Sequence, residues 1–138
     1  MRAETKLGKV IIRTRDKRVF RGFSKADLIN DQVQLIDAKG NQQQFDLQEL
    51  KAVFFVKDFE GDSDYRVVRF VRGSAVPQWL WAQATFFDGE TIEGRVRNGL
   101  SLFDNRGVFL WLSDEESNNE VVFVVRSALR DFRIVGIV

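Results

Sequence analysis

Two stretches of this 138-residue chain read as degenerate copies of one another, and this duplication constrains the fold most. The first copy opens with residues 10–16 and the second with residues 82–88, each ending in aspartate. A lone glycine follows six residues later in both copies, Gly22 in the first and Gly94 in the second. Because each copy of a repeat forms the same supersecondary unit, we expect two similar units in tandem.

Short apolar or alternating runs, separated by turn signals, fill both copies. Such runs predict β-strands, and no apolar periodicity supports a helix longer than about two turns. The two glycines are expected where a long second strand bends sharply, because a residue without Cβ tolerates the crowding of a bend. The expected strands are 10–14, 19–23, 33–36, 42–45 and 51–56 in the first copy, with a helical turn at 47–50, and 81–87, 90–97, 108–112, 120–125 and 132–138 in the second.

Five short strands with a helical turn before the fifth are typical of a small SH3-like or Sm-like barrel. We therefore expect an all-β fold of two tandem small SH3-like/Sm-like β-barrels packed together, since about 50 residues is too few for a comfortable core of its own. Segment 51–56 is apolar on both faces, which predicts a central buried strand. The expected boundaries are 1–57 for the first barrel, 58–78 for an acidic and arginine-containing linker, and 79–138 for the second barrel.

The chain contains no cysteine and no histidine, and these absences limit its chemistry. Without them there are no disulfides, no thiolate nucleophiles, no serine-triad base and none of the usual transition-metal ligands. We expect a non-enzymatic protein that needs no cofactor or metal. The N-terminus lacks the apolar region of a signal peptide and no run approaches eighteen apolar residues, so a cytoplasmic location is expected.

Charge is distributed unevenly although the net charge is only +1. Residues 1–25 carry nine basic and two acidic side chains, a net of +7, whereas residues 26–65 carry nine acidic and three basic side chains, a net of −6. A basic start suits contacts with phosphates. The alternative is that it neutralises the acidic segment of the same protein or of a second copy, and the small net charge favours this alternative.

Several basic and aromatic side chains are candidates for contacts with a partner or a nucleic acid. Tryptophans at alternate positions share one face of a strand, and an arginine in the turn before the last strand occupies a loop that contacts nucleotides in Sm-type proteins. The simpler interpretation of the many phenylalanines is core packing. The candidates are Arg13, Arg15, Lys17, Arg18, Arg126, Trp79 and Trp81.

Carboxylates at alternate positions, from Asp58 to Asp64 around Gly61, raise the question of a calcium loop. An EF-hand loop that starts at Asp58 requires glutamate at its twelfth position, where this chain has Arg69. A solvated acidic linker is the better interpretation, and no metal site is expected.

Two segments together resemble an uncharacterised bacterial domain family. They are Phe54-Phe55-Val56-Lys57-Asp58-Phe59-Glu60-Gly61-Asp62, within segment 50–62, and Ser117-Asn118-Asn119-Glu120-Val121-Val122-Phe123-Val124-Val125-Arg126-Ser127-Ala128. Segment 85–94 looks like the opening of the family's second barrel. The resemblance spans nearly the whole chain and implies a bacterial accessory module, alone or attached to signalling proteins. It brings no catalytic residue with it.

These observations predict a non-enzymatic binding or regulatory interaction module. The alternative is an Sm-like binder of RNA or single-stranded nucleic acid. A protein partner or self-association, as a homo-oligomer, is expected because short barrels leave edge strands that a second chain can pair with. No membrane contact is expected.

Overall fold

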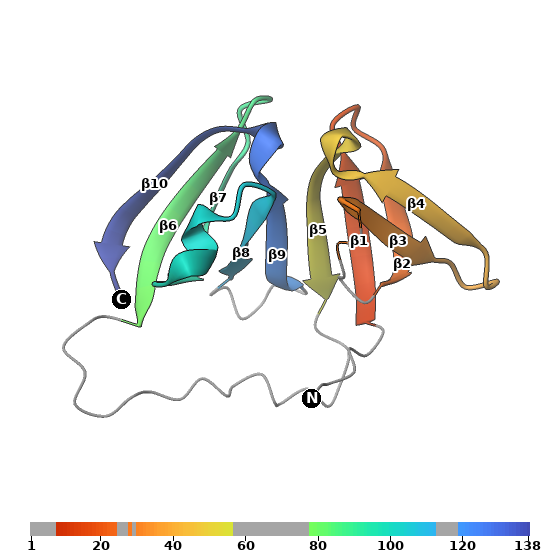
Figure 1. Ribbon diagram of the computed structural model, residues 1–138, viewed down its shortest axis with the longest axis horizontal. Helices are drawn as coiled ribbons and strands as arrows, with labels where there is room; N and C mark the ends of the chain where they lie inside the picture. The colour runs from red at the N-terminus through yellow and green to blue at the C-terminus, as the bar shows by residue number, and fades with distance from the viewer. Residues whose placement is uncertain (1–7, 25–27, 29, 57–77, 113–118) are drawn as a thin grey trace.

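The structure, a computed structural model, describes residues 8–24, 28, 30–56, 78–112 and 119–138. Within these residues the protein is all-β, with ten antiparallel strands in one open sheet (Figure 1). The helical elements of the described chain are three single 3₁₀ turns. The elements are β1 Gly8–Thr14, β2 Val19–Ser24, β3 Gln32–Ile36, β4 Gln42–Asp46, η1 Leu47–Glu49, β5 Leu50–Val56, β6 Trp79–Phe86, β7 Thr91–Arg97, η3 Leu100–Phe103, β8 Gly107–Trp111, β9 Asn119–Val125, η4 Arg126–Ala128 and β10 Leu129–Ile137.

The strand order is the same in the two halves of the sheet. The first half runs β5-β1-β2-β3-β4 and the second runs β10-β6-β7-β8-β9. The two halves meet where β9 pairs with β5, in the middle of the view in Figure 1. The expected all-β class is therefore confirmed, but two separate closed barrels are not: the described strands form a single ladder that ends at the β10 and β4 edges.

The central position of β5 explains its composition. Six of its seven residues are buried, all but Phe55, because β1 covers one edge, β9 covers the other, and both faces meet side chains. The prediction of a central buried strand at 51–56 is confirmed. Its partner β9 is apolar from Val121 to Val125, and all five of these residues are buried. Each such side chain contributes about 1.5–3 kcal/mol of transfer free energy on full burial, so this junction is part of the core.

The first hairpins of the two halves share their backbone hydrogen bonds at a spacing of 72 residues. Thr14 N–H donates to Arg18 O over 3.0 Å, and Phe86 N–H donates to Glu90 O over 2.9 Å. Lys17 and Gly89 occupy the same place in these turns, and both have positive φ, 71° and 96°. Glycine adopts this conformation freely, whereas lysine does so at a cost.

Gly22 and Gly94 lie in like surroundings, each next to the point where the second and third strands of its half meet. A Cβ on Gly22 would lie 2.6 Å from Ile36 O, and one on Gly94 would lie 2.8 Å from Trp111 O. The adjacent strands pair at a single position in each half, Phe23 with Ile36 and Arg95 with Trp111. Only glycine permits so close a backbone approach.

The spacing between equivalent residues is larger at the 3₁₀ turn before the last strand of each half. Arg15 N–H donates to Glu49 O and Phe87 N–H donates to Ala128 O, so the spacing there is 79. Arg126 therefore corresponds to Leu47. The expected linker, apart from Gln78, and the carboxylates from Asp58 to Asp64 lie outside the described residues. No helix among the described residues is long and apolar enough to cross a bilayer.

Candidate functional site

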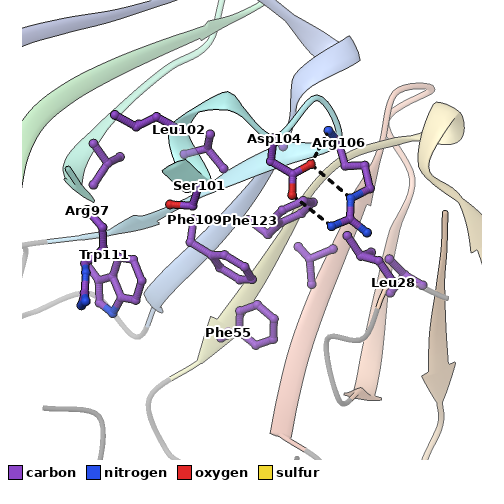
Figure 2. A pocket seen from close by; sticks show the side chains of 15 residues that line it. Leu28, Phe55, Arg97, Ser101, Leu102, Asp104, Arg106, Phe109, Trp111 and Phe123 are labelled. Atoms are coloured by element: carbon purple, nitrogen blue, oxygen red, sulfur yellow. Dashed lines mark hydrogen bonds and ion pairs between the residues drawn. The ribbon is translucent and has the colours of Figure 1, made fainter. Parts of the chain in front are cut away.

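A cavity of about 470 Å³ lies where the two halves meet, and we call it the junction groove. Strands β5, β8 and β9 form its floor, and the η3 turn with the loop after it forms one side (Figure 2). Side chains of both halves contribute to it. Its lining residues are Leu28, Val33, Val53, Phe55, Val96, Arg97, Ser101, Leu102, Asp104, Arg106, Gly107, Val108, Phe109, Trp111 and Phe123.

Strand register explains why aromatic residues distant in the sequence meet in this groove. Phe123 on β9 lies opposite Val53 on β5 and opposite Phe109 on β8. The next row places Val121 between Phe55 and Trp111 in the same way, with one residue on each strand. Residues opposite one another on neighbouring strands point to the same face, so two aromatic rows form side by side.

The rings contact one another in a continuous chain around Phe109. Its centroid lies 4.9 Å from Phe123, 6.2 Å from Phe55 and 6.2 Å from Trp111, all in tilted arrangements. Trp111 meets Trp79 edge to face at 5.2 Å. Phe109 remains 38% exposed although it is at the centre of the chain. We call Phe55, Phe109, Trp111 and Trp79 the aromatic stripe.

Two arginines of β7 stand at the end of this stripe. The guanidinium carbons of Arg95 and Arg97 lie 5.0 and 5.3 Å from the centre of the Trp79 ring. Cation–π contacts of this kind hold a guanidinium against an aromatic face without neutralising its charge. Among the described residues neither arginine forms an ion pair with a carboxylate. This end of the stripe is therefore both aromatic and positive.

The opposite rim of the groove carries a neutralised ion pair. Arg106 donates to Asp104 from Nε over 3.1 Å and from Nη2 over 3.0 Å, as the dashed lines in Figure 2 show. These hydrogen bonds hold the pKa of Asp104 below its ordinary value and raise the pKa of Arg106. Arg126 fixes the same loop, because its guanidinium donates to the carbonyl oxygens of Leu102, over 2.8 Å, and Asp104, over 3.0 Å.

A second cavity, of about 450 Å³, contains a partly buried ion-pair network between the two halves. The side chain of Lys51 is only 7% exposed, and its Nζ contacts both Asp88, at 2.7 Å, and Glu90. Arg13 reaches Glu90 over 3.0 Å. The hydrogen bond from Lys51 holds the pKa of Asp88 below its ordinary value. Partial burial acts to raise the pKa of Glu90, but hydrogen bonds from Lys51 and Arg13 outweigh this effect and lower it.

The basic side chains that the sequence singled out mostly have partners within the protein. Arg13 pairs with Glu90, Arg18 binds Asp16 through Nε over 3.0 and 3.1 Å, and Arg15 donates to Ser127 Oγ over 2.8 Å. Lys17 is exposed at its turn and lines the second cavity beside Arg13 and Arg18. The structure thus brings three of the four together, next to carboxylates of the second half.

The other three candidates lie in the second half. Trp79 belongs to the aromatic stripe, and Trp81 lies two residues further along the same strand, where its Nε1–H donates to Glu93 over 3.1 Å. Arg126 is committed to two backbone carbonyls and to a cation–π contact at 5.6 Å with Phe132. It lies beside the groove and supports its rim.

Sequence reasoning missed the groove itself because it assigned most phenylalanines to the core. Phe55 and Phe109 are only partly buried, since they lie on the face where the two halves diverge. Lys51 was also missed. A lone lysine in an otherwise apolar strand is the signal that could have marked it, because a buried cation requires a partner. No group of three metal-ligating side chains occurs in the described part of the chain.

Comparison with known proteins identifies a family and little else. The family described as "Family of unknown function (DUF6982)" matches residues 6–136. Neither the curated proteins nor the solved structures contain a match.

Proposed function

The chain belongs to a family of unknown function (DUF6982), so we propose its role from the site: it is a non-enzymatic binding module whose junction groove takes an acidic, aromatic-containing segment of a partner protein. The observation that carries this proposal is the aromatic stripe, with Arg95 and Arg97 at its end. Partly exposed aromatic rings with adjacent arginines are typical of the centres of protein interfaces.

Charge selects the kind of segment. The Asp104–Arg106 pair on one rim is neutral, whereas the arginines beside Trp79 are not balanced by carboxylates among the described residues. An acidic segment would satisfy these guanidinium groups while its aromatic side chains occupy the cavity. The volume of about 470 Å³ lies within the range of sites that hold a few side chains.

A binding role also fits the carboxylates better than catalysis does. Every described carboxylate with a resolved pKa shift has a lowered pKa, because each accepts hydrogen bonds from cations, hydroxyls or backbone N–H groups. A general acid near neutral pH requires a raised pKa. These carboxylates therefore act as permanently charged structural groups.

We also propose that the two halves arose by duplication of one five-stranded unit of the SH3-like or Sm-like type. The common strand order, the matching hairpin hydrogen bonds and the like surroundings of Gly22 and Gly94 support this origin. The two halves differ in their fourth strand, which is polar in the first half (β4) and apolar in the second half (β9). Because β9 is apolar, it can pair with β5, and this pairing forms the groove.

The test measures tryptophan fluorescence during titration with three defined probes: a synthetic acidic peptide with two aromatic residues, the same peptide with lysine in place of each acidic residue, and a uridine oligonucleotide. We expect the acidic peptide to bind, and Phe109→Ala and Arg97→Glu each to weaken its binding at least tenfold. Phe87→Ala is the matched control, since Phe87 is 64% exposed at a hairpin outside the groove. Equal affinities for all variants, or no binding of the acidic peptide, would contradict the proposal.

Single-stranded nucleic acid is the second candidate ligand. The observation that favours it is the contact of Trp79 with Trp111 beside arginines, because bases can stack on such rings. Binding of the oligonucleotide that weakens steeply with salt, together with no binding of the acidic peptide, would favour this candidate, because phosphate contacts release counterions.

A further inference from the structure

The sheet ends at two edge strands, β4 and β10, which differ in chemistry. Their counterparts in the other halves, β9 and β5, pair with each other at the junction. By strand order, β10 corresponds to β5 and β4 corresponds to β9. The β5–β9 junction shows that this type of strand accepts an antiparallel neighbour. In the described part of the chain, β4 and β10 each have one neighbour, so each presents a free edge.

The β4 edge is polar. At the spacing of 79 residues, Val121, Val122 and Phe123 of β9 correspond to Gln42, Gln43 and Gln44, all three exposed. A glutamine-rich strand of five residues gains little by burial. Its shortness is one of the ways in which proteins protect an edge strand against further pairing.

A head-to-tail contact between copies would also lose part of the charge pairing of the internal junction. Such a contact would repeat the β5–β9 junction with β10 of one copy and β4 of the next. The counterparts of Lys51, Asp88 and Glu90 are then Arg130, Asp16 and Arg18. Arg130 would meet one carboxylate, which already pairs with Arg18, and a cation in place of the second carboxylate, so this contact is less favourable than the internal junction.

The β10 edge is apolar over its second half. Ile134, Val135, Ile137 and Val138 are all exposed, with Ile137 exposed by 72%. These four residues are consecutive apart from Gly136 and lie at one edge of the sheet, and we call them the apolar patch. Asp131 and Arg133, which precede the patch, form an ion pair with each other over 2.8 Å and need no outside partner.

We propose that the β10 edge is a self-association surface, which pairs antiparallel with β10 of a second copy about a two-fold axis within residues 133–137. This extends the sheet as the β5–β9 junction does, and it covers the apolar patches with each other. A two-fold contact closes at two copies. The register between β10 and β6 shifts between Ile134 and Gly136, which shortens the regular part of β10 that can pair with a second copy. We therefore expect the dimer to be reversible.

The absence of cysteine permits a direct test. Single substitutions Arg133→Cys, Ile134→Cys, Val135→Cys and Ile137→Cys are oxidised under mild conditions, with Gln43→Cys on the β4 edge as the matched control. Near a two-fold axis like residues approach within disulfide range, about 4.4–6.8 Å between Cα atoms. We expect at least one β10 position to cross-link with itself at least tenfold faster than Gln43→Cys. Light scattering should show dimers of the unsubstituted protein that increase with concentration.

Two outcomes would overturn the proposal. One is that no β10 position cross-links faster than the control and the protein remains a monomer at high concentration. The other is that a mixture of Gln43→Cys and Arg133→Cys proteins gives mainly the mixed disulfide, which would establish the head-to-tail arrangement, because these two positions correspond to the Val122 and Phe54 pair of the internal junction. Because the groove variant Phe109→Ala lies away from this edge, it should dimerise normally, so the two proposals fail independently.

Discussion

The ammonium group of Lys51 lies 2.7 Å from the carboxylate of Asp88, and this ion pair joins the last strand of the first half to the first hairpin of the second. Glu90 completes the contact from the same hairpin, and the ring of Phe86 lies 4.8 Å from Lys51 Nζ. The interaction lies beside the β5–β9 junction and fixes the second half against the first. The two halves are thus joined by this polar interaction and by the apolar pairing of β5 with β9.

Replacing Lys51 with methionine should destabilise the protein. The substitution keeps the length of the side chain but leaves two partly buried carboxylates without their cation. We expect the free energy of unfolding in urea to fall by about 1–3 kcal/mol. Lys39→Met, at an exposed hairpin position, should change it by less than about 0.5 kcal/mol. A Lys51→Met protein as stable as the control would show that the network contributes nothing.

The same network predicts sensitivity to acid. The pKa values of Asp88 and Glu90 are lowered in the folded state, so folding favours their charged forms. This stabilisation is fully present above the ordinary carboxylate range, about pH 4, and is lost as the pH falls through the lowered values. Urea unfolding from pH 7 to pH 3 should show that the stability difference between wild type and Lys51→Met narrows below about pH 4. A difference that widens on acidification would contradict this assignment.

Alanine at either strand-crossing glycine should be poorly tolerated. The added Cβ would meet backbone oxygen, at 2.6 Å for Gly22 and 2.8 Å for Gly94, and backbone cannot move aside cheaply. We expect Gly22→Ala and Gly94→Ala each to lower the free energy of unfolding by about 1–3 kcal/mol. Gly99→Ala is the control, because its Cβ would meet nothing within 4 Å and its φ of −168° is extended. A large loss at only one of the first two positions would count against their equivalence.

Glycine at position 17 should stabilise the first hairpin. Lys17 has a φ of 71°, and its counterpart in the second half is Gly89. Lys17→Gly removes the conformational cost, so thermal unfolding should show a gain of about 1 kcal/mol. Lys39→Gly, at a residue without positive φ, should be neutral or destabilising because it adds freedom to the unfolded chain. A destabilised Lys17→Gly protein would mean that the lysine side chain has a structural role.

Local pattern predicted the strands well because each strand carries its own signal. The turn between the expected strands 81–87 and 90–97 and the apolar run 51–56 both have the predicted structure. The sequence showed that 51–56 is buried on both faces, yet it did not identify β9 as its neighbour. Pairing between distant strands depends on the whole arrangement, and a local apolar pattern does not specify it.

The candidate site was harder to predict for the same reason. From the sequence, Phe109 looks like a core residue. It is exposed because it lies on the face where the two halves diverge, and the sequence does not show that face. Basic residues such as Arg13 and Arg126 suggested phosphate contacts, but their guanidinium groups have partners within the chain. Trp79 was identified because its alternation with Trp81 is visible in the sequence.

The two halves share one sheet through β5 and β9, and the junction groove is therefore a fixed feature of the fold. Hydrogen–deuterium exchange of the backbone amides tests it most directly, because protection reports which strands are paired on both sides. We predict that amides of β5 and β9 exchange as slowly as those of β1 and β6, and far more slowly than those of the edge strand β4. Rapid exchange along β5 and β9, at the rate of β4, would contradict this arrangement.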